Sequence, residues 1–144
     1  MLTTGAEMEG GCACGAIRYR LTVKPTETSW CHCRHCRKSS GAPAVPYATL
    51  PRSGFHLDLG EEHLCGVHLT EFAERLFCGR CGSPIATKLD HQPAEIDVTV
   101  ATLDDPEALP PEFHIFCSSE ISWARHSDGS PRYAQNRRDG ELMP

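Results

Sequence analysis

The sequence has no long apolar run, no excess of positive charge and no internal repeat. A membrane-spanning helix needs about 20 consecutive apolar residues, and no stretch approaches that length. The net charge is −5, whereas domains dedicated to nucleic-acid phosphates usually carry a positive excess. The N-terminal stretch MLTTGAEMEGG has neither the basic region nor the apolar region of a secretory signal. We therefore expect a soluble, cytoplasmic protein with neither a membrane nor a nucleic acid as its partner.

The length of the chain limits the number of domains. Its 144 residues fall within the usual size of one domain, and a chain of this length can form a core without covalent staples. From residue 125 onward the sequence is polar and contains Gly and Pro, which is typical of a tail that runs along the surface. The sequence thus predicts a single domain over residues 1–144 that ends in a polar tail.

Cysteine, in contrast, is abundant, with nine residues in the chain. A disulfide framework would be expected in a small secreted protein, but the count is odd and no signal peptide is evident. In a reducing compartment, clustered cysteines are more often metal ligands. We therefore interpret the clusters as metal sites.

Two of the clusters are short turns that each end in glycine. Cys12-Ala-Cys14 precedes Gly15, and Cys78-Gly-Arg-Cys81 precedes Gly82. Glycine can adopt the positive φ that a turn often needs to direct two thiolates at one ion. Together the pairs supply the four ligands of a closed, structural zinc site. The alternative is two unrelated pairs of buried thiols, because 63 residues separate the pairs and CxC with CxxC is not a stereotyped combination.

The third cluster, CHCRHC, places three cysteines in six residues. Cys31, Cys33 and Cys36 fill three corners of a tetrahedron, and an open fourth position is typical of catalytic zinc. His32 or His35 could close the site, but each adjoins a cysteine ligand and would tend to point away from a shared ion. We expect an open three-cysteine site on an exposed surface loop.

Alternating apolar and polar residues predict an all-β domain. Residues 16–23 place Ile17, Tyr19, Leu21 and Val23 on one face and Arg18, Arg20 and Thr22 on the other. Further strands are expected at 44–50, 54–59, 95–103 and 112–117. Residues 68–77 also favour a strand, although Leu69, Phe72 and Leu76 fit a helical spacing as well. Only 104–112 could hold a turn of helix, and its three prolines keep that turn short.

Five segments together resemble a known family. GGCACGAIRY, WCHCRHCRKSSGA, RLFCGRCGSPI, VATLDDP and HIFCSSEISW occur in this order. They resemble the glutathione-dependent formaldehyde-activating enzyme family, which includes the centromere protein V-type domain. The resemblance extends from about Gly11 to Tyr133 and implies a domain core over about 10–133.

The resemblance also implies a fold, cofactors and an activity. The fold would be a twisted, β-sandwich-like all-β domain with two zinc ions. One zinc would be structural, at Cys12, Cys14, Cys78 and Cys81, and the other would occupy the active site at Cys31, Cys33 and Cys36 and bind the thiol of glutathione. The implied activity is that of a carbon–sulfur lyase that adds formaldehyde to glutathione, an S-(hydroxymethyl)glutathione synthase-like enzyme. Cys65 and Cys117 lie outside the ligand pattern, and we expect them to be small buried hydrophobes.

The residues of the CHCRHC segment suit this chemistry. A thiol that coordinates zinc is deprotonated, so the site would present a thiolate to a small carbonyl compound. Arg34, Arg37 and Lys38 could offset the negative charge or bind the carboxylates of a glutathione-like ligand; the alternative is that they are solvated surface bases. His32 and His35 are candidate proton shuttles. The competing function is a non-catalytic, zinc-stabilised protein-interaction module, in which CHCRHC is merely structural.

Overall fold

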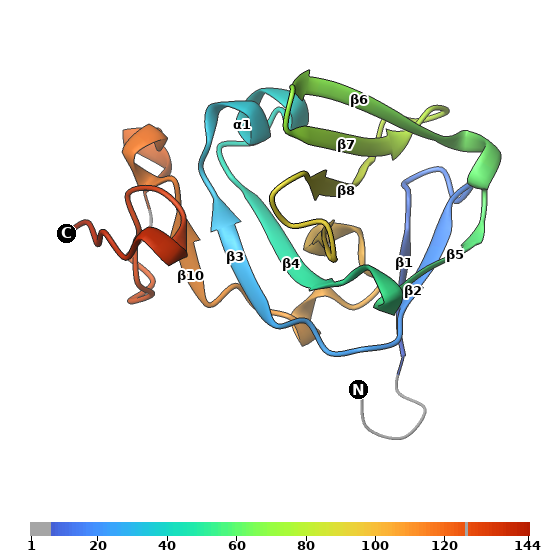
Figure 1. Cartoon of the computed structure of the whole chain (residues 1–144), viewed down its shortest axis with the longest axis horizontal. Coiled ribbons are helices and arrows are strands. Elements are labelled where there is room, and N and C mark those ends of the chain that lie inside the picture. Colours follow the sequence, from blue (N-terminus) through green and yellow to red (C-terminus); the bar gives the residue numbers. More distant parts are fainter. Residues whose placement is uncertain (1–6, 126) are drawn as a thin grey trace.

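The computed structural model describes residues 7–125 and 127–144. Residues 1–6, where no secretory signal was expected, lie outside the described residues. Two β-sheets and one α-helix, α1 (Arg34–Ser40), form this part of the chain (Figure 1). None of its helices is long and apolar enough to cross a membrane.

The two sheets differ in size. The smaller has the order β1-β2-β5 and the larger the order β10-β3-β4-β9-β8-β7-β6. All pairs of neighbouring strands are antiparallel except β10 and β3, which are parallel. The strands are β1 (Met8–Gly11), β2 (Arg18–Leu21), β3 (Glu27–Cys31), β4 (Val45–Pro51), β5 (Phe55–Leu59), β6 (Leu64–Thr70), β7 (Ala73–Cys78), β8 (Pro84–Leu89), β9 (Glu95–Thr99) and β10 (Phe113–Ile115).

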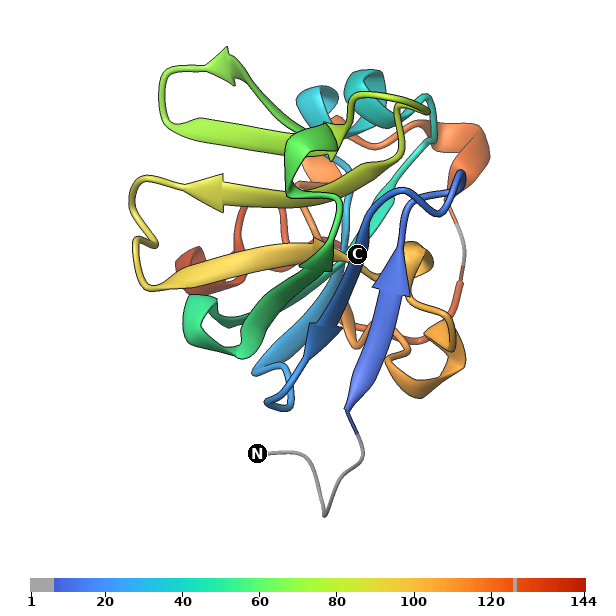
Figure 2. The ribbon, with the colours of Figure 1, turned by 90° about the vertical axis from the view of Figure 1, so that its right-hand side faces the viewer.

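The core lies between the two sheets. Figure 2 shows β1 and β2 lying across the larger sheet. Tyr19 and Leu21 of β2 are buried in one hydrophobic cluster with Leu50 and Val98 of the larger sheet. The alternating residues of β2 face outward, where Arg18 and Arg20 form ion pairs with acidic side chains. Period-2 alternation therefore identified this face of the sandwich correctly, and the prediction of a sandwich-like all-β fold is confirmed.

The strands that were predicted from alternation within a single segment are present in the structure. The segments expected at 44–50 and 54–59 are β4 and β5, and those at 95–103 and 112–117 contain the shorter strands β9 and β10. Residues 68–77 are not one strand, because a turn after Thr70 divides them between β6 and β7. The short helix expected in 104–112 is a single 3-10 turn at Pro106–Ala108.

The CHCRHC segment is not the exposed loop that we expected. Its first cysteine ends β3, and its last lies in the first turn of α1. The Cys33 side chain caps this helix by accepting a hydrogen bond from the backbone N–H of Cys36 at 3.2 Å. Gly41, with φ of 74°, ends it. Cysteine is not a usual capping residue, so the residue pattern contained little sign of a helix here.

The polar C-terminal segment is hydrogen-bonded to β10. Figure 1 shows it, in orange to red, beside β10 at the edge of the larger sheet. Backbone N–H groups of His114 and Phe116 donate to the carbonyls of Pro131 and Gln135, each at 2.9 Å. The Tyr133 ring also packs edge-on against Phe113, with 5.8 Å between the ring centroids. These contacts fix the segment against the side of the sheet that carries the three-cysteine cluster.

Candidate functional site

The four cysteines of the two glycine-ended turns meet in one cluster. The Sγ atoms of Cys12 and Cys14 are 3.5 Å apart, and those of Cys14 and Cys78 are 3.9 Å apart. All four, including that of Cys81, lie within 4.8 Å of one another. Four thiolates around zinc at about 2.3 Å would be separated by about 3.8 Å, so the set fits a tetrahedral zinc ion.

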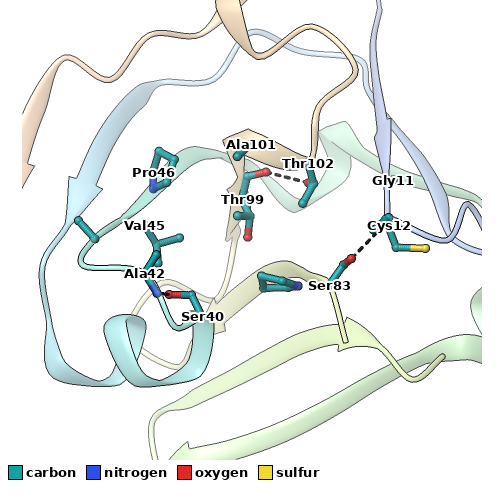
Figure 3. Close-up of a pocket in the computed structure, with 13 residues that line it drawn as sticks. Gly11, Cys12, Ser40, Ala42, Val45, Pro46, Ser83, Thr99, Ala101 and Thr102 are labelled. Carbon is teal, nitrogen blue, oxygen red and sulfur yellow. Dashed lines mark hydrogen bonds between the residues drawn. The ribbon is translucent and has the colours of Figure 1, made fainter. Parts of the chain in front are cut away.

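The surrounding backbone shows why the cluster forms. Gly15 and Gly82 both have φ of 81°, the left-handed conformation expected for the two turns. The N–H of Ala13 donates to the Ser83 hydroxyl at 2.9 Å and ties one turn to the other (Figure 3). Hydrogen bonding to Ser83 lowers the pKa of Cys81 to about 5, which favours the thiolate that a metal ligand requires.

A cavity of about 370 Å³ lies beside this cluster. Figure 3 shows its wall of small side chains, among them Ala42, Val45 and Ala101. Cys12 is the only ionisable side chain among the described residues that line it. This cavity therefore offers no catalytic group apart from a candidate ligand of the four-cysteine cluster.

Cys31, Cys33 and Cys36 form a second cluster, which is more buried than the first. The Sγ atoms of Cys31 and Cys36 are 3.2 Å apart, and all three thiols lie within 4.8 Å of one another. Cys31 and Cys36 are only 4% and 5% exposed. Hydrogen bonds from the Cys31 and Cys36 thiols lower the pKa of Cys33 to about 2, whereas the hydrogen bonds of Cys31 with Cys33 and Cys36 raise the pKa of Cys31. The lowered pKa of Cys33 favours a thiolate at this partly buried position beside two buried thiols, which suits a cation.

Neither histidine joins the three thiols. His32 points away from them, and its Nε2 lies 2.9 Å from His114 Nδ1. His114 in turn binds Asp128 through Nε2 at 2.7 Å. His35 is exposed at the edge of the adjoining cleft. Among the described residues, no fourth Cys, His, Asp or Glu completes this cluster, so its fourth position is open to a ligand.

There is a third group of possible ligands, which consists of His32, Cys117 and Glu120. The guanidinium of Arg132 already forms an ion pair with Glu120. The Glu120 carboxylate is therefore already paired with a positive charge, and we assign no metal ion to the group. Cys117 is buried, as expected, whereas Cys65 is only partly buried.

A cleft of about 290 Å³ opens from the three-cysteine cluster. Strand pairing forms its floor, because it aligns Thr49, Asp97, Thr87 and Arg75 in one row across β4, β9, β8 and β7. Phe116, in the wall, has φ of 55°, a strained conformation for a residue with a bulky side chain. Strained residues of this kind concentrate at functional sites.

Two polar side chains in the cleft are directed at Cys36. The hydroxyl of Tyr47 and Nη2 of Arg75 each lie 3.6 Å from Cys36 Sγ. Nη1 of Arg75 also donates to the Tyr47 hydroxyl at 3.3 Å, which fixes the pair. Burial alone would lower the pKa of Arg75, but the nearby charges of Cys36 and Tyr47 raise it above its ordinary value. A permanent cation therefore lies against the thiols.

Asp97 places a carboxyl group in the same cleft. Burial raises the pKa of its carboxyl to about 6, although the Thr49 hydroxyl donates to it at 2.6 Å. A carboxyl with this pKa can both release and accept a proton near neutrality. Asp97, Tyr47 and Arg75 could not be recognised from the sequence, because each lies on a separate strand and only the sheet register brings them together.

The basic residues expected from sequence lie elsewhere. Arg34 and Lys38 are exposed on α1, and Arg37 is partly buried. None of the three lines the cleft, whose arginines are Arg75, Arg137 and Arg138.

The structure defines a mostly β domain whose two cysteine clusters could each hold a metal ion, and sequence comparison gives its family. Residues 7–119 match the glutathione-dependent formaldehyde-activating enzyme family, and the chain belongs to it.

Three known proteins are similar to the chain. A Halomonas elongata protein, provisionally named a glutathione-dependent formaldehyde-activating enzyme, is 30% identical over 81% of the chain and 78% of its own length. A Schizosaccharomyces pombe protein, described as an uncharacterized lyase, is 30% identical over 55% of the chain; the chain spans 56% of that protein. A crystal structure of a Rhodobacter sphaeroides protein matches with a TM-score of 0.57 and 27% identity, over 67% of this chain and 88% of that one.

Proposed function

We propose that this chain is a carbon–sulfur lyase-type enzyme that joins a thiol such as glutathione to a small carbonyl compound such as formaldehyde, or separates them. The observation that carries the proposal is the open three-thiol cluster at a cleft into which Arg75 and Tyr47 also point. Family membership and the names of two relatives support the same class of reaction. We further propose that the whole chain acts as one domain.

In this proposal the chain binds two zinc ions. Cys12, Cys14, Cys78 and Cys81 hold a structural ion, and Cys31, Cys33 and Cys36 hold the ion of the active site. An ion bound by three thiolates would keep a coordinated substrate thiol deprotonated. The side chains of the cleft supply the remaining functions.

The reaction needs a sulfur nucleophile and a proton. The thiolate sulfur attacks the carbonyl carbon, the C–S bond forms as the C=O π bond breaks, and the oxygen takes up a proton to give a hydroxymethyl thioether. Arg75 offsets the negative charge gathered at the sulfur atoms. We assign the proton to Asp97, because its raised pKa allows the carboxyl to donate near neutrality and to take the proton back in the reverse direction.

The alternative is a non-catalytic, zinc-stabilised interaction module. A fourth ligand that closed the three-cysteine cluster would favour such a module. However, His32 is directed away from the three thiols, and the imidazole of His35 does not lie with them. The arrangement of the described residues therefore favours the enzyme.

Exchange NMR of a glutathione–formaldehyde mixture tests the proposal. We expect the wild-type protein to accelerate formation and breakdown of S-hydroxymethylglutathione above the buffer rate, and Cys33→Ser to abolish the acceleration. Cys65→Ser is the matched control, because Cys65 lies outside both clusters, and it should retain wild-type activity. Exchange at the buffer rate with zinc-loaded wild-type protein would contradict the proposal.

A further inference from the structure

The C-terminal segment contributes to the cleft although it lies beyond the family match. The match ends at residue 119, yet Asn136, Arg137 and Arg138 line the cleft together with the three cysteines. This wall therefore comes from a part of the chain that the family comparison does not cover. Residues of this kind are candidates for setting which thiol the enzyme accepts.

We propose that Arg137 and Arg138 form the subsite that binds the carboxylates of the thiol substrate, and that they select a peptide-sized acidic thiol. This inference rests on the proposed function. It assigns the substrate's carboxylates to the C-terminal segment and not to the basic residues of α1, none of which lines the cleft.

The two arginines are held in place by their own segment. Asn136 accepts a hydrogen bond from the N–H of Asp139 at 2.9 Å and so caps the 3-10 turn that carries both arginines. The turn ends at Gly140, where φ is 69°. The guanidinium of Arg137 also lies 4.8 Å from the centroid of the Phe113 ring. The turn fixes the backbone of both arginines, and the ring also restricts the side chain of Arg137.

Both arginines retain the capacity to bind an incoming anion. Arg137 pairs with Glu27 and Arg138 with Glu95, each through one terminal nitrogen at 3.3 Å. The arginine side chains are 53% and 65% exposed, so these pairs are screened by water and are weak. A guanidinium carries several N–H donors in a planar fork, which leaves donors for a bidentate carboxylate.

The position of the two arginines determines how large a thiol must be for its carboxylates to reach them. Arg137 reaches Glu27 at the beginning of β3, whereas Cys31 ends the same strand. Four residues of strand span about 13 Å. A two-carbon thiol bound at the cysteines would not reach the arginines, whereas a tripeptide-sized thiol has carboxylates several bonds from its sulfur. The geometry therefore favours a substrate of glutathione's size and charge.

Steady-state kinetics of Arg137→Gln/Arg138→Gln test the inference, with formaldehyde and one of three thiols: glutathione, its diethyl ester or 2-mercaptoethanol. For glutathione we expect KM to rise about tenfold, the lower end of the range for charge-assisted hydrogen bonds, with kcat within about twofold of wild type. The diethyl ester and 2-mercaptoethanol, which have no carboxylate, should show no rise in KM, which would also report an intact fold. Arg125→Gln, in the same segment but outside the cleft, is the matched control.

The outcomes separate this inference from the proposed function. Catalysis by the wild type with an unchanged glutathione KM in the double variant would overturn the carboxylate subsite alone. An equal rise in KM for glutathione and its diethyl ester would also overturn it, because the effect would not depend on the carboxylates. A wild-type protein that accelerates no thiol would overturn both.

Discussion

Cys81→Ser is expected to yield aggregated or proteolysed protein, because it removes a ligand from the cluster that joins the turn at 12–14 to the turn at 78–81. More than sixty residues of chain lie between these turns. The binding free energy of a structural zinc is folding free energy, about 10–16 kcal/mol apparent at neutral pH. Soluble yield, a circular-dichroism melt and zinc content per chain would measure the loss.

Cys33→Ser is the matched variant in the other cluster. It should stay soluble, melt cooperatively and retain one zinc ion, but lose thiol-dependent activity. The three cysteines close only a six-residue segment, and β3 and β4 pair without them. Serine is also a good N-cap, so the substitution preserves the capping of α1 that Cys33 provides. If Cys33→Ser unfolded as completely as Cys81→Ser, the three-cysteine cluster would be a second structural clamp and the interaction-module alternative would prevail.

Arg75→Gln is expected to lower kcat/KM for thiol and formaldehyde by about 10- to 100-fold while the protein remains folded. The estimate follows from the loss of a hydrogen bond to a charged group, which contributes about 1.5–3 kcal/mol. The kcat/KM of Arg75→Lys should lie between those of Arg75→Gln and the wild type. It keeps the charge but cannot contact Tyr47, Ser39 and Cys36 together, as the guanidinium does.

The control for this prediction is Arg20→Gln. Arg20 also forms ion pairs, but they lie on the outer face of the smaller sheet, away from the cleft. Its replacement should leave kcat/KM within about twofold of wild type. Wild-type kinetics in Arg75→Gln would show that the guanidinium does not act on the thiols.

Local patterns in the sequence predicted the buried face of β2 and the two turns that end in glycine. The alternation in β2 identified the buried face that contains Tyr19 and Leu21, and the glycines after the paired cysteines indicated the two left-handed turns. Strand β3 was missed because Thr28 and Ser29, which are adjacent and polar, are both buried, so the segment has no alternation.

The cleft could not be predicted in the same way, because it depends on contacts between distant strands. Tyr47 and Arg75 meet at Cys36 only because β4 and β7 belong to one sheet with a particular order. The sequence contains these residues, but their order along the chain does not reveal the strand register that aligns them. For the same reason the polar sequence of the segment that carries Arg137 and Arg138 does not reveal that its backbone pairs with β10.

Binding of the thiol substrate's sulfur at the three-cysteine cluster is tested most directly by thermal unfolding with and without thiol. A ligand that binds only the folded state at a hundredfold excess over its Kd adds about 2.7 kcal/mol to the free energy of unfolding. We predict that glutathione raises the Tm of the zinc-loaded protein more than S-methylglutathione does, because a methylated sulfur cannot deprotonate, and that this difference disappears in Cys33→Ser. Equal shifts from the two compounds in the wild-type protein would contradict the claim, since the ligand would then be held without its thiol.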